Sequence, residues 1–433
     1  MAERYDLILR NGHVIDPANG IDEVRDVAVR DGRIVLCAKD IPVNPVNPVN
    51  PVNPAGSADR TTRVVDVTGS YVTPGLIDIH SHVYPLLPKG AANTLLTIDA
   101  DTHMLRSGVT TTVDVGTVGW RDFLDFKERV VDVSHVRVLA MLNVASGGMV
   151  NMDTEQNPAE LHPQITAAVA RQYPDIIVGI KAAHYWVGRP FDAIHTPWAS
   201  VDAGLEAAEL AGLPFMIDFC PNHSKPGRSY EDLVTHKLRP GDIHTHVFAQ
   251  QFPILDENRR VRPFMWAARE RGVFFDVGHG AGSFWFRNAK PAFDDGFVPD
   301  TISTDMHVHS VLFAGLDQLQ TMSKFMAIGM SLQEVVRRST TEAARLIRRP
   351  DLGTLSPGAG ADIAVFRKLD GAFNYVDCGK ARLRGSARLD CLMTIRDGKI
   401  LYDANGLSLP DWEEAPAAYW KIPFLPTEDE GEQ

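Results

Sequence analysis

The chain has 433 residues and a formal charge of -12. Such an acidic balance argues against nucleic acid or an anionic membrane surface as the partner. The length exceeds the range over which one hydrophobic core keeps growing, so we expect one large domain and a smaller one. The four cysteines show no CxxC spacing, and neither an apolar leader nor an apolar run of about 18 residues occurs. We therefore expect a soluble, cytoplasmic protein.

The first 70 residues are predicted to form short strands of a small sheet. Segments 5–16, 26–38 and 63–69 alternate apolar and polar residues, and Asn-Gly, Asp-Gly and Thr-Gly pairs mark turns between strands. Within this region, residues 42–54 repeat the triplet Val-Asn-Pro. Proline at every third position removes backbone donors and favours extended, solvated chain. We interpret 42–54 as a surface loop, with a Pro-rich recognition motif as the weaker alternative.

Residues 71–350 follow a different rhythm, in which short β-rich segments alternate with longer helical ones. The strand candidates are 75–80, 110–115, 136–144, 176–182, 213–219, 242–248, 272–278 and 300–305. Helical segments such as 158–173 and 199–212 lie between them. Eight βα units close most economically into a (β/α)8 barrel, which is an α/β fold. A doubly wound open sheet is the alternative, but no glycine-rich phosphate turn follows the first strand.

Strand-like segments return between residues 351 and 433. Segments 361–367 and 388–403 are rich in β-branched and apolar residues. We expect them to pair with residues 1–70 as one small β-sandwich beside the barrel. The chain then ends in an acidic tail that begins near Trp412.

Side chains of ligand type stand at almost every predicted strand end. In a (β/α)8 barrel these ends meet at one mouth, where chemistry gathers. The first strand, GLIDIHSH, ends in two histidines spaced two apart, which point to the same side of a strand. The full set is His80, His82, Lys181, Asp218, His244, His246, His279 and Asp305. Each residue alone has an ordinary structural explanation, but burying so many charges together is costly unless a divalent metal compensates.

These motifs resemble those of the amidohydrolase superfamily, in particular its D-aminoacylase, dihydroorotase and deacetylase-like branch. The resemblance rests on GLIDIHSH, the strand-four lysine, Thr-His at strand six and STDMH at strand eight, and it covers nearly the whole chain. It implies two divalent metal ions, usually zinc, bridged by a carboxylated lysine and a hydroxide that hydrolyses amide or ester bonds. By position, His80, His82 and Asp305 would hold the first metal, His246 would hold the second, and carboxylated Lys181 would bridge them.

Lys181 and Asp305 would have distinct tasks in this scheme. An ammonium group repels metal ions, whereas a carbamate offers two anionic oxygens, and a lysine buried beside cations loses its proton readily. Asp305 would act as general acid and base, taking the proton of the bridging water and returning it to the leaving group. The metals would lower the pKa of that water and polarise the scissile carbonyl.

The fifth strand departs from the family pattern. Relatives carry a ligand histidine there, whereas this chain has PFMIDFCPNH with Asp218 in that place. Three interpretations stay open: Asp218 replaces the histidine, His184 or His223 supplies the missing nitrogen, or one ion suffices. We favour Asp218, and charge counting gives the consequence that this second aspartate would make the metal cluster neutral. An added oxygen ligand would also shift the preference from zinc toward manganese or iron.

Other residues near the mouth are candidates for binding the substrate. His279 lies among glycines that allow close approach, and it could donate to a substrate carbonyl or carboxylate. His184 and Tyr185 follow the fourth strand, and Trp285 follows the seventh. They would form an aromatic-walled pocket for a small molecule, such as an N-acyl amino acid, a cyclic ureide or an acetyl ester.

Two alternatives to a binuclear hydrolase remain. A mononuclear deaminase normally lacks the strand-four lysine and needs a glutamate in an HxxE-like turn, which does not stand out here. A non-catalytic barrel serving as an oligomeric scaffold would have little reason to keep the ligand set together. The resemblance also allows a homo-oligomer. The sequence of the βα loops, which determine specificity, does not identify the leaving group of the substrate.

Overall fold

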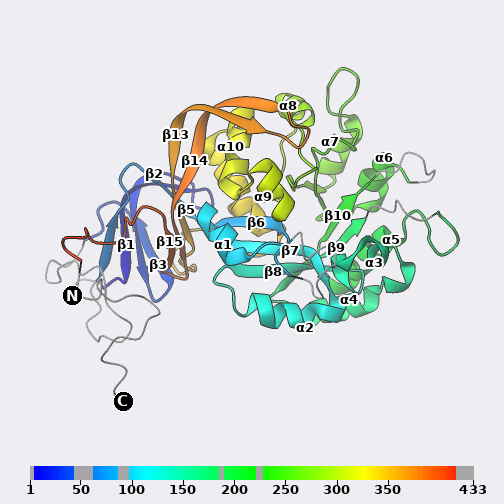
Figure 1. Ribbon diagram of the computed structural model, residues 1–433, viewed down its shortest axis with the longest axis horizontal. Coiled ribbons are helices and arrows are strands. Elements are labelled where there is room, and N and C mark those ends of the chain that lie inside the picture. The colour runs from blue at the N-terminus through cyan, green and yellow to red at the C-terminus, as the bar shows by residue number, and fades with distance from the viewer. Residues whose placement is uncertain (1–3, 43–61, 86–96, 185–189, 221–227, 416–433) are drawn as a thin grey trace, which may run out of the picture.

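The structure, a computed structural model, describes residues 4–42, 62–85, 97–184, 190–220 and 228–415. The chain forms two joined parts, a sheet built from both chain ends and a larger α/β part (Figure 1). The Pro-rich segment 42–54 lies outside the described residues apart from Pro42, and so does the end of the tail from residue 416. Among the described helices, none combines the length and the apolar character that crossing a membrane requires.

A curled parallel sheet forms the centre of the α/β part. Its seven strands are neighbours in chain order from β6 to β12. Their bounds are β6 Leu76–Ser81, β7 Val109–Gly119, β8 Arg137–Asn143, β9 Ile177–His184, β10 Phe215–Phe219, β11 Ile243–His244 and β12 Phe274–Phe275. Every residue of β6 and β7 is buried, as expected for parallel strands that are covered on both faces.

The segment predicted as the eighth strand, 300–305, joins the two edges of this sheet. Thr301 forms a parallel bridge with Asp276, which follows β12, and Met306 forms one with Ser81 at the end of β6. The sheet is therefore closed on itself, as a (β/α)8 barrel requires. The closing connection consists of isolated bridges and backbone hydrogen bonds instead of a regular strand.

Helices cover the outside of the closed sheet (Figure 1). Their bounds are α1 Ala100–Met104, α2 Phe123–Phe126, α3 Met152–Glu155, α4 Pro163–Gln172, α5 Ala199–Ala211, α6 Tyr230–Asp232, α7 Pro263–Glu270, α8 Phe286–Asp294, α9 Val308–Ala314, α10 Gln318–Ile328, α11 Leu332–Arg338 and α12 Thr341–Leu346. Single turns of 3-10 or π helix span Leu105–Ser107, Trp120–Asp122, Lys127–Val131, Gly148–Val150, Pro158–Glu160 and Leu233–Lys237. The helix predicted at 199–212 is confirmed as α5. The helix predicted at 158–173 begins only at Pro163, because proline lacks the N–H that a helix interior needs.

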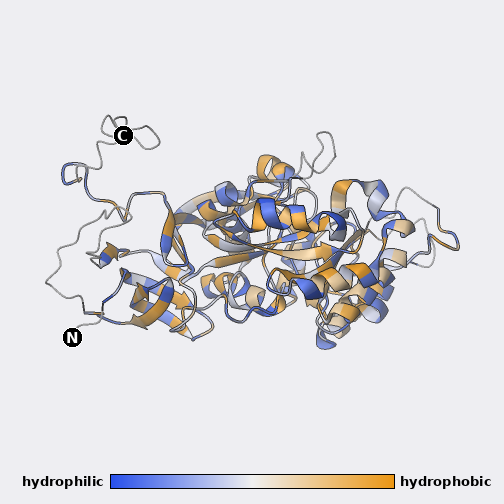
Figure 2. Ribbon diagram, turned by 90° about the horizontal axis from the view of Figure 1, so that it is seen from below, coloured by the Kyte–Doolittle hydropathy of each residue, from blue (hydrophilic) through white to orange (hydrophobic). Residues whose placement is uncertain are grey.

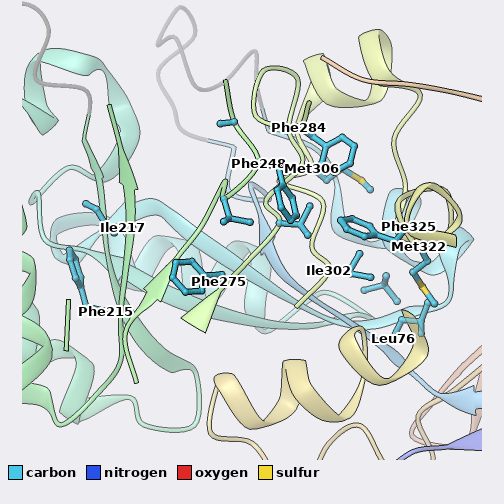
Figure 3. Packing of buried hydrophobic residues seen from close by; sticks show 14 of the residues in the cluster. Leu76, Phe215, Ile217, Phe248, Phe275, Phe284, Ile302, Met306, Met322 and Phe325 are labelled. Carbon is cyan, nitrogen blue, oxygen red and sulfur yellow. The ribbon is translucent and has the colours of Figure 1, made fainter. Parts of the chain in front are cut away.

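Apolar side chains fill both faces of the sheet. Figure 3 shows Phe215, Ile217 and Phe275 of the sheet in the same cluster as Met322 and Phe325 of α10. Burying each such side chain contributes about 1.5–3 kcal/mol. A separate cluster joins the sheet to α12, and its members include Ile77, Val113, Met141, Met216, Ile243, Ala343 and Leu346. Figure 2 accordingly shows apolar residues along the strands of the barrel.

Strands from both chain ends form a second sheet, called here the terminal sheet. Its strands are β1 Leu7–Asp16, β2 Ile21–Arg30, β3 Arg33–Ala38, β4 Arg63–Asp66, β5 Tyr71–Pro74, β13 Ile363–Val376, β14 Arg382–Arg396 and β15 Lys399–Asp403. Their order is β15-β14-β13-β5-β1-β2-β3, with β4 paired to β1. The two chain ends meet where β5 pairs antiparallel with β13, which sets Val72 opposite Val365. A sandwich arrangement and domain limits at residues 70 and 350 stay predictions.

Candidate metal centre

Three histidines and an aspartate meet at the carboxyl ends of the barrel strands, called here the mouth. His80 lies in β6, His82 directly follows it, His246 follows β11, and Asp305 lies in the closing segment. Asp305 Oδ1 is 3.1 Å from His82 Nε2 and 3.6 Å from His80 Nε2. His80, His246 and Asp305 each offer one ligand atom, and these atoms lie within 4.8 Å of one another. All four side chains are buried.

Each of these histidines turns its Nε2 toward the centre of the cluster. His82 Nδ1 lies 2.7 Å from Thr117 Oγ1, and His246 Nδ1 lies 2.6 Å from the Gly278 carbonyl oxygen. A carbonyl oxygen only accepts, so His246 carries its proton on Nδ1 when neutral. His80 Nδ1 also contacts a hydroxyl oxygen, at 2.9 Å. In the neutral form, the His246 Nε2 lone pair is therefore available to a cation.

The backbone at this cluster adopts conformations that side chains disfavour. His246 has φ +61° and Asp305 has φ +48°, in the left-handed region. His307 Nδ1 lies 2.7 Å from the Asp305 carbonyl oxygen and supports the turn there. A β-carbon at Gly280 would lie within 3.0 Å of Asp305 Oδ2, so only glycine leaves room for the carboxylate. Such strained, closely packed backbone is typical of functional sites.

Lys181 is buried among carboxylates beside this cluster. Its side chain packs against Gly116, where a β-carbon would lie 2.6 Å from Lys181 Cγ. Burial lowers the pKa of the Lys181 ammonium, although Asp218, Asp305 and Asp276 oppose that effect. A lowered pKa favours the neutral amine, which is the form that can react with carbon dioxide.

Asp218, in β10, stands beside His246. The distance from Asp218 Oδ2 to His246 Nε2 is 3.3 Å. Burial alone would lower the pKa of His246, but Asp218 and Asp305 outweigh burial and raise the pKa to about 9. His246 Nε2 therefore lies where the negative charges of Asp218 and Asp305 attract a cation. The His184 side chain and His223 lie outside the described part of the chain, so Asp218 as a metal ligand stays a prediction.

Two further polar residues of the mouth were not predicted from the sequence. Glu155 in α3 is buried, and its Oε1 accepts a hydrogen bond of 3.0 Å from Asn143 Nδ2. Asn143 also donates to the Gly116 carbonyl and accepts from the Ala145 N–H, which fixes its amide orientation. Burial, helped by the charge of Asp218, raises the pKa of Glu155 to about 8. The place of Asn143 at a strand end could have identified it, whereas nothing in the sequence around Glu155 does.

Both ring nitrogens of His279 are engaged within the protein. Nδ1 lies 2.9 Å from the Gly280 carbonyl oxygen, and Nε2 lies 2.9 Å from Lys324 Nζ. The ring also stacks on Phe284 with 4.6 Å between ring centroids. A direct contact with substrate would require one of these hydrogen bonds to break, so that role stays a prediction. Lys324, which approaches His279 from α10, was not predicted from the sequence.

The tip of the β13–β14 hairpin holds the loop that leads into α8. The Cys378 N–H donates to the Phe284 carbonyl at 3.0 Å, and Asp377 Oδ2 accepts a backbone N–H of α8 at 3.0 Å. Gly379 packs so closely on the Trp285 ring that a β-carbon there would lie within 3.0 Å of it. The hairpin reaches across from the terminal sheet to α8 (Figure 1). Both parts of the molecule therefore build this side of the barrel.

The predicted aromatic pocket is described only in part. Trp285 is half-buried, and its Nε1 donates to the Gly282 carbonyl at 3.1 Å. The Arg287 guanidinium lies over the Trp285 ring, 4.6 Å from its centroid. Tyr185 lies outside the described residues. The role of these aromatic residues in substrate binding therefore stays a prediction.

His244 does not belong to the cluster. Its ring packs against Tyr230 of α6, Phe252, and Phe275 of β12. Burial lowers the pKa of His244 to about 4, so the ring is neutral. The backbone turns at His246, and strand alternation therefore does not carry both histidines to one site.

The donor set suits divalent metal ions. Imidazole nitrogens and carboxylate oxygens are the usual ligands of catalytic zinc, and they also suit manganese and iron. The histidine nitrogens in this mouth are pointed inward by hydrogen bonds at Nδ1, as metal-binding histidines require. The residues present thus fit a divalent metal site, and the second metal that the resemblance implies stays a prediction.

Sequence comparisons match the chain to a family model and to curated relatives. Residues 303–402 match the model of the amidohydrolase family. A deacetylase of Agrobacterium fabrum is 29% identical over 322 residues, which cover 73% of this chain and 75% of the relative. A deacetylase of Enterococcus faecalis is 26% identical, and the match covers 84% of this chain and 89% of the relative.

Solved structures share the fold. The crystal structure of a dihydroorotase matches with a TM-score of 0.73 and 25% identity, covering 91% of this chain and 98% of that one. The crystal structure of an adenine deaminase matches with a TM-score of 0.76 and 24% identity, covering 92% of this chain and 100% of that one. The second likeness concerns the fold alone.

Proposed function

Because this chain belongs to the amidohydrolase superfamily, we propose that it is a metal-dependent hydrolase that cleaves an amide, cyclic amide or ester bond of a small molecule. The observation that carries the proposal is the convergence of His80, His82 and His246 on Asp305 in the buried barrel mouth. Imidazole nitrogens and a carboxylate that meet in one buried site are the donors that catalytic divalent metals use in proteins.

The residues would divide between two metal sites. His80, His82 and Asp305 would hold one divalent ion, most favourably zinc. His246 and Asp218 would hold the other, for which manganese or iron is also suitable. Carboxylated Lys181 would contribute an anionic oxygen to each site. When bound, the metals supply acidification of a water molecule and polarisation of the scissile carbonyl.

Asp305 is the group that moves the proton. Burial alone would raise the pKa of Asp305, but His80, His307 and His82 hold it below its ordinary value, so the carboxylate is ionised before reaction. It accepts one proton from water as the oxygen attacks the carbonyl carbon. The same proton then goes to the departing nitrogen or oxygen as the bond to the carbonyl carbon breaks. Asp305 is thereby returned to its carboxylate form.

Among substrate classes, we favour acyclic acyl compounds. The relatives named deacetylase align with 73% to 84% of this chain, whereas the dihydroorotase of Streptococcus pneumoniae aligns with only 18%. An N-acyl amino acid or an acetyl ester of a hydroxy acid therefore stands ahead of a cyclic ureide.

A substrate panel tests the proposal. Protein reconstituted with Zn²⁺ or Mn²⁺ would be incubated with N-acetyl amino acids, acetyl esters, cyclic ureides and adenine. Release of acetate is the expected result, and Asp305→Asn should abolish it. Ammonia release from adenine with no acyl hydrolysis would favour the mononuclear deaminase. Purified protein that binds no metal would favour the non-catalytic scaffold.

A further inference from the structure

A buried chain of hydrogen bonds lies behind His80. His80 Nδ1 is 2.9 Å from Thr245 Oγ1, and Thr245 Oγ1 is 2.8 Å from Asp276 Oδ2. His80 Nδ1 lies 3.7 Å from the same carboxylate oxygen, too far for a direct hydrogen bond. All three side chains are fully enclosed. The threonine hydroxyl therefore connects the imidazole to the carboxylate.

The chemistry of the end groups decides which group donates in each of these two hydrogen bonds. An ionised carboxylate only accepts, and a hydroxyl has one proton to give. Hydrogen bonds to a charged acceptor are the stronger ones, so Thr245 gives its proton to Asp276. The Thr245 oxygen is then left to accept, and His80 must donate from Nδ1. His80 Nε2 consequently carries the lone pair, on the side that faces Asp305.

The Asp276 carboxylate is itself held in place. Thr301 Oγ1 donates to Asp276 Oδ1 at 2.7 Å, and Ser303 Oγ donates to Asp276 Oδ2 at 2.7 Å. Both donors come from the segment that closes the barrel and leads to Asp305. Asp276 therefore has no freedom to turn away from Thr245, and its oxygens are occupied by donors.

From this arrangement we propose that Thr245 and Asp276 are positioning residues that fix the metal-binding tautomer of His80. The inference rests on the metal centre proposed above. Without an acceptor at Nδ1, the His80 proton is free to sit on Nε2, where it blocks coordination. Loss of such a partner behind a metal-bound histidine typically weakens metal affinity about 10–100-fold.

Thr245→Val provides the test, because valine keeps the shape of threonine and removes only the hydroxyl. Thr301→Val is the matched control, because it removes a hydroxyl that donates to the same Asp276 carboxylate but does not contact His80. Thr245→Ser should restore the wild-type behaviour. Affinity for Zn²⁺ would be measured by competition with a chromophoric chelator, and metal content by mass spectrometry, alongside the melting temperature of each metal-free variant.

We expect Thr245→Val to bind one of its metal ions about 10–100-fold more weakly than Thr301→Val, at similar metal-free stability. Equal Zn²⁺ affinity in the two variants would overturn the positioning role while leaving the metal centre intact. Wild-type protein that takes up no Zn²⁺ would instead overturn the metal centre itself. If Thr245→Val does not fold, Thr245→Ser decides. Wild-type affinity for Zn²⁺ in Thr245→Ser supports the positioning role of the Thr245 hydroxyl, and weakened affinity contradicts it.

Discussion

Replacing Gly280 with alanine should displace the Asp305 carboxylate without removing any polar group. Gly280 has φ +54°, and a β-carbon there would lie within 3.0 Å of Asp305 Oδ2. Because ordinary van der Waals contact begins at 3.4 Å, the carboxylate would have to retreat by several tenths of an ångström to about 1 Å. Its other oxygen is only 3.1 Å from His82 Nε2, so the retreat would disturb the residues proposed to bind metal as well.

The effects on stability and on activity should differ in size. A left-handed conformation costs an alanine about 1–2 kcal/mol, which lowers the melting temperature of a chain of this length by only a few degrees. A catalytic group misplaced by about 1 Å can cost on the order of 100-fold in rate. We therefore expect kcat/KM for the best acetyl substrate to fall about 100-fold in Gly280→Ala, in protein that remains folded.

Gly282→Ala is the control for this experiment. Gly282 lies in the same loop, and a β-carbon there would meet no heavy atom within 4 Å. This variant should keep the activity, melting temperature and metal content of the wild type. Wild-type activity in Gly280→Ala, or an equal loss in both variants, would refute the claim that Gly280 makes room for the carboxylate.

Four other changes have expected outcomes. Metal removal with a chelator should lower the melting temperature and abolish turnover, and added Zn²⁺ or Mn²⁺ should restore both. Lys181→Ala should hold at most one metal ion, and native mass spectrometry should no longer detect the carbon dioxide adduct expected on the wild type. Asp218→Asn should weaken the second metal about tenfold or more, and unchanged metal content would exclude Asp218 as a ligand. In the metal-free protein, Glu155 has a pKa of about 8, above its ordinary value of 4.5, so the folded state binds its proton more tightly than the unfolded state does. The stability that Glu155 contributes should therefore fall as the pH rises from about 4.5 through 8. Glu155→Gln should lose that pH dependence in chemical unfolding, whereas parallel curves for the two proteins would contradict it.

The strands could be predicted because their signal is local. The segments predicted at 110–115, 136–144 and 176–182 are confirmed as β7, β8 and β9, since runs of β-branched and apolar residues mark buried strands. The predicted ends of the strands were less accurate: β7 continues to Gly119, past the predicted end at residue 115. The eighth segment was also located, but its pairing by single bridges depends on both sheet edges, which no local pattern records.

The gathering of histidines in the barrel mouth could be predicted because histidines at strand ends are chemically distinctive, whereas their role as metal ligands stays a prediction. His80, His82 and His246 do gather around Asp305. Their supporting partners were missed for a physical reason. A threonine such as Thr245 looks the same in sequence whether it lies on a surface or behind a metal ligand, and its partner Asp276 lies 31 residues away.

The contact between the β13–β14 hairpin and the loop before α8 limits how this enzyme can be altered. A fragment restricted to the barrel would leave the Phe284 carbonyl without its donor, the Cys378 N–H. It would also leave the Phe286 N–H at the start of α8 without its acceptor, Asp377 Oδ2. Transplanting the barrel loops onto another scaffold would therefore have to include the hairpin tip. A side chain at Gly379, far from Asp305 in the sequence, would likewise press directly on the Trp285 ring and shift the loop that leads into α8.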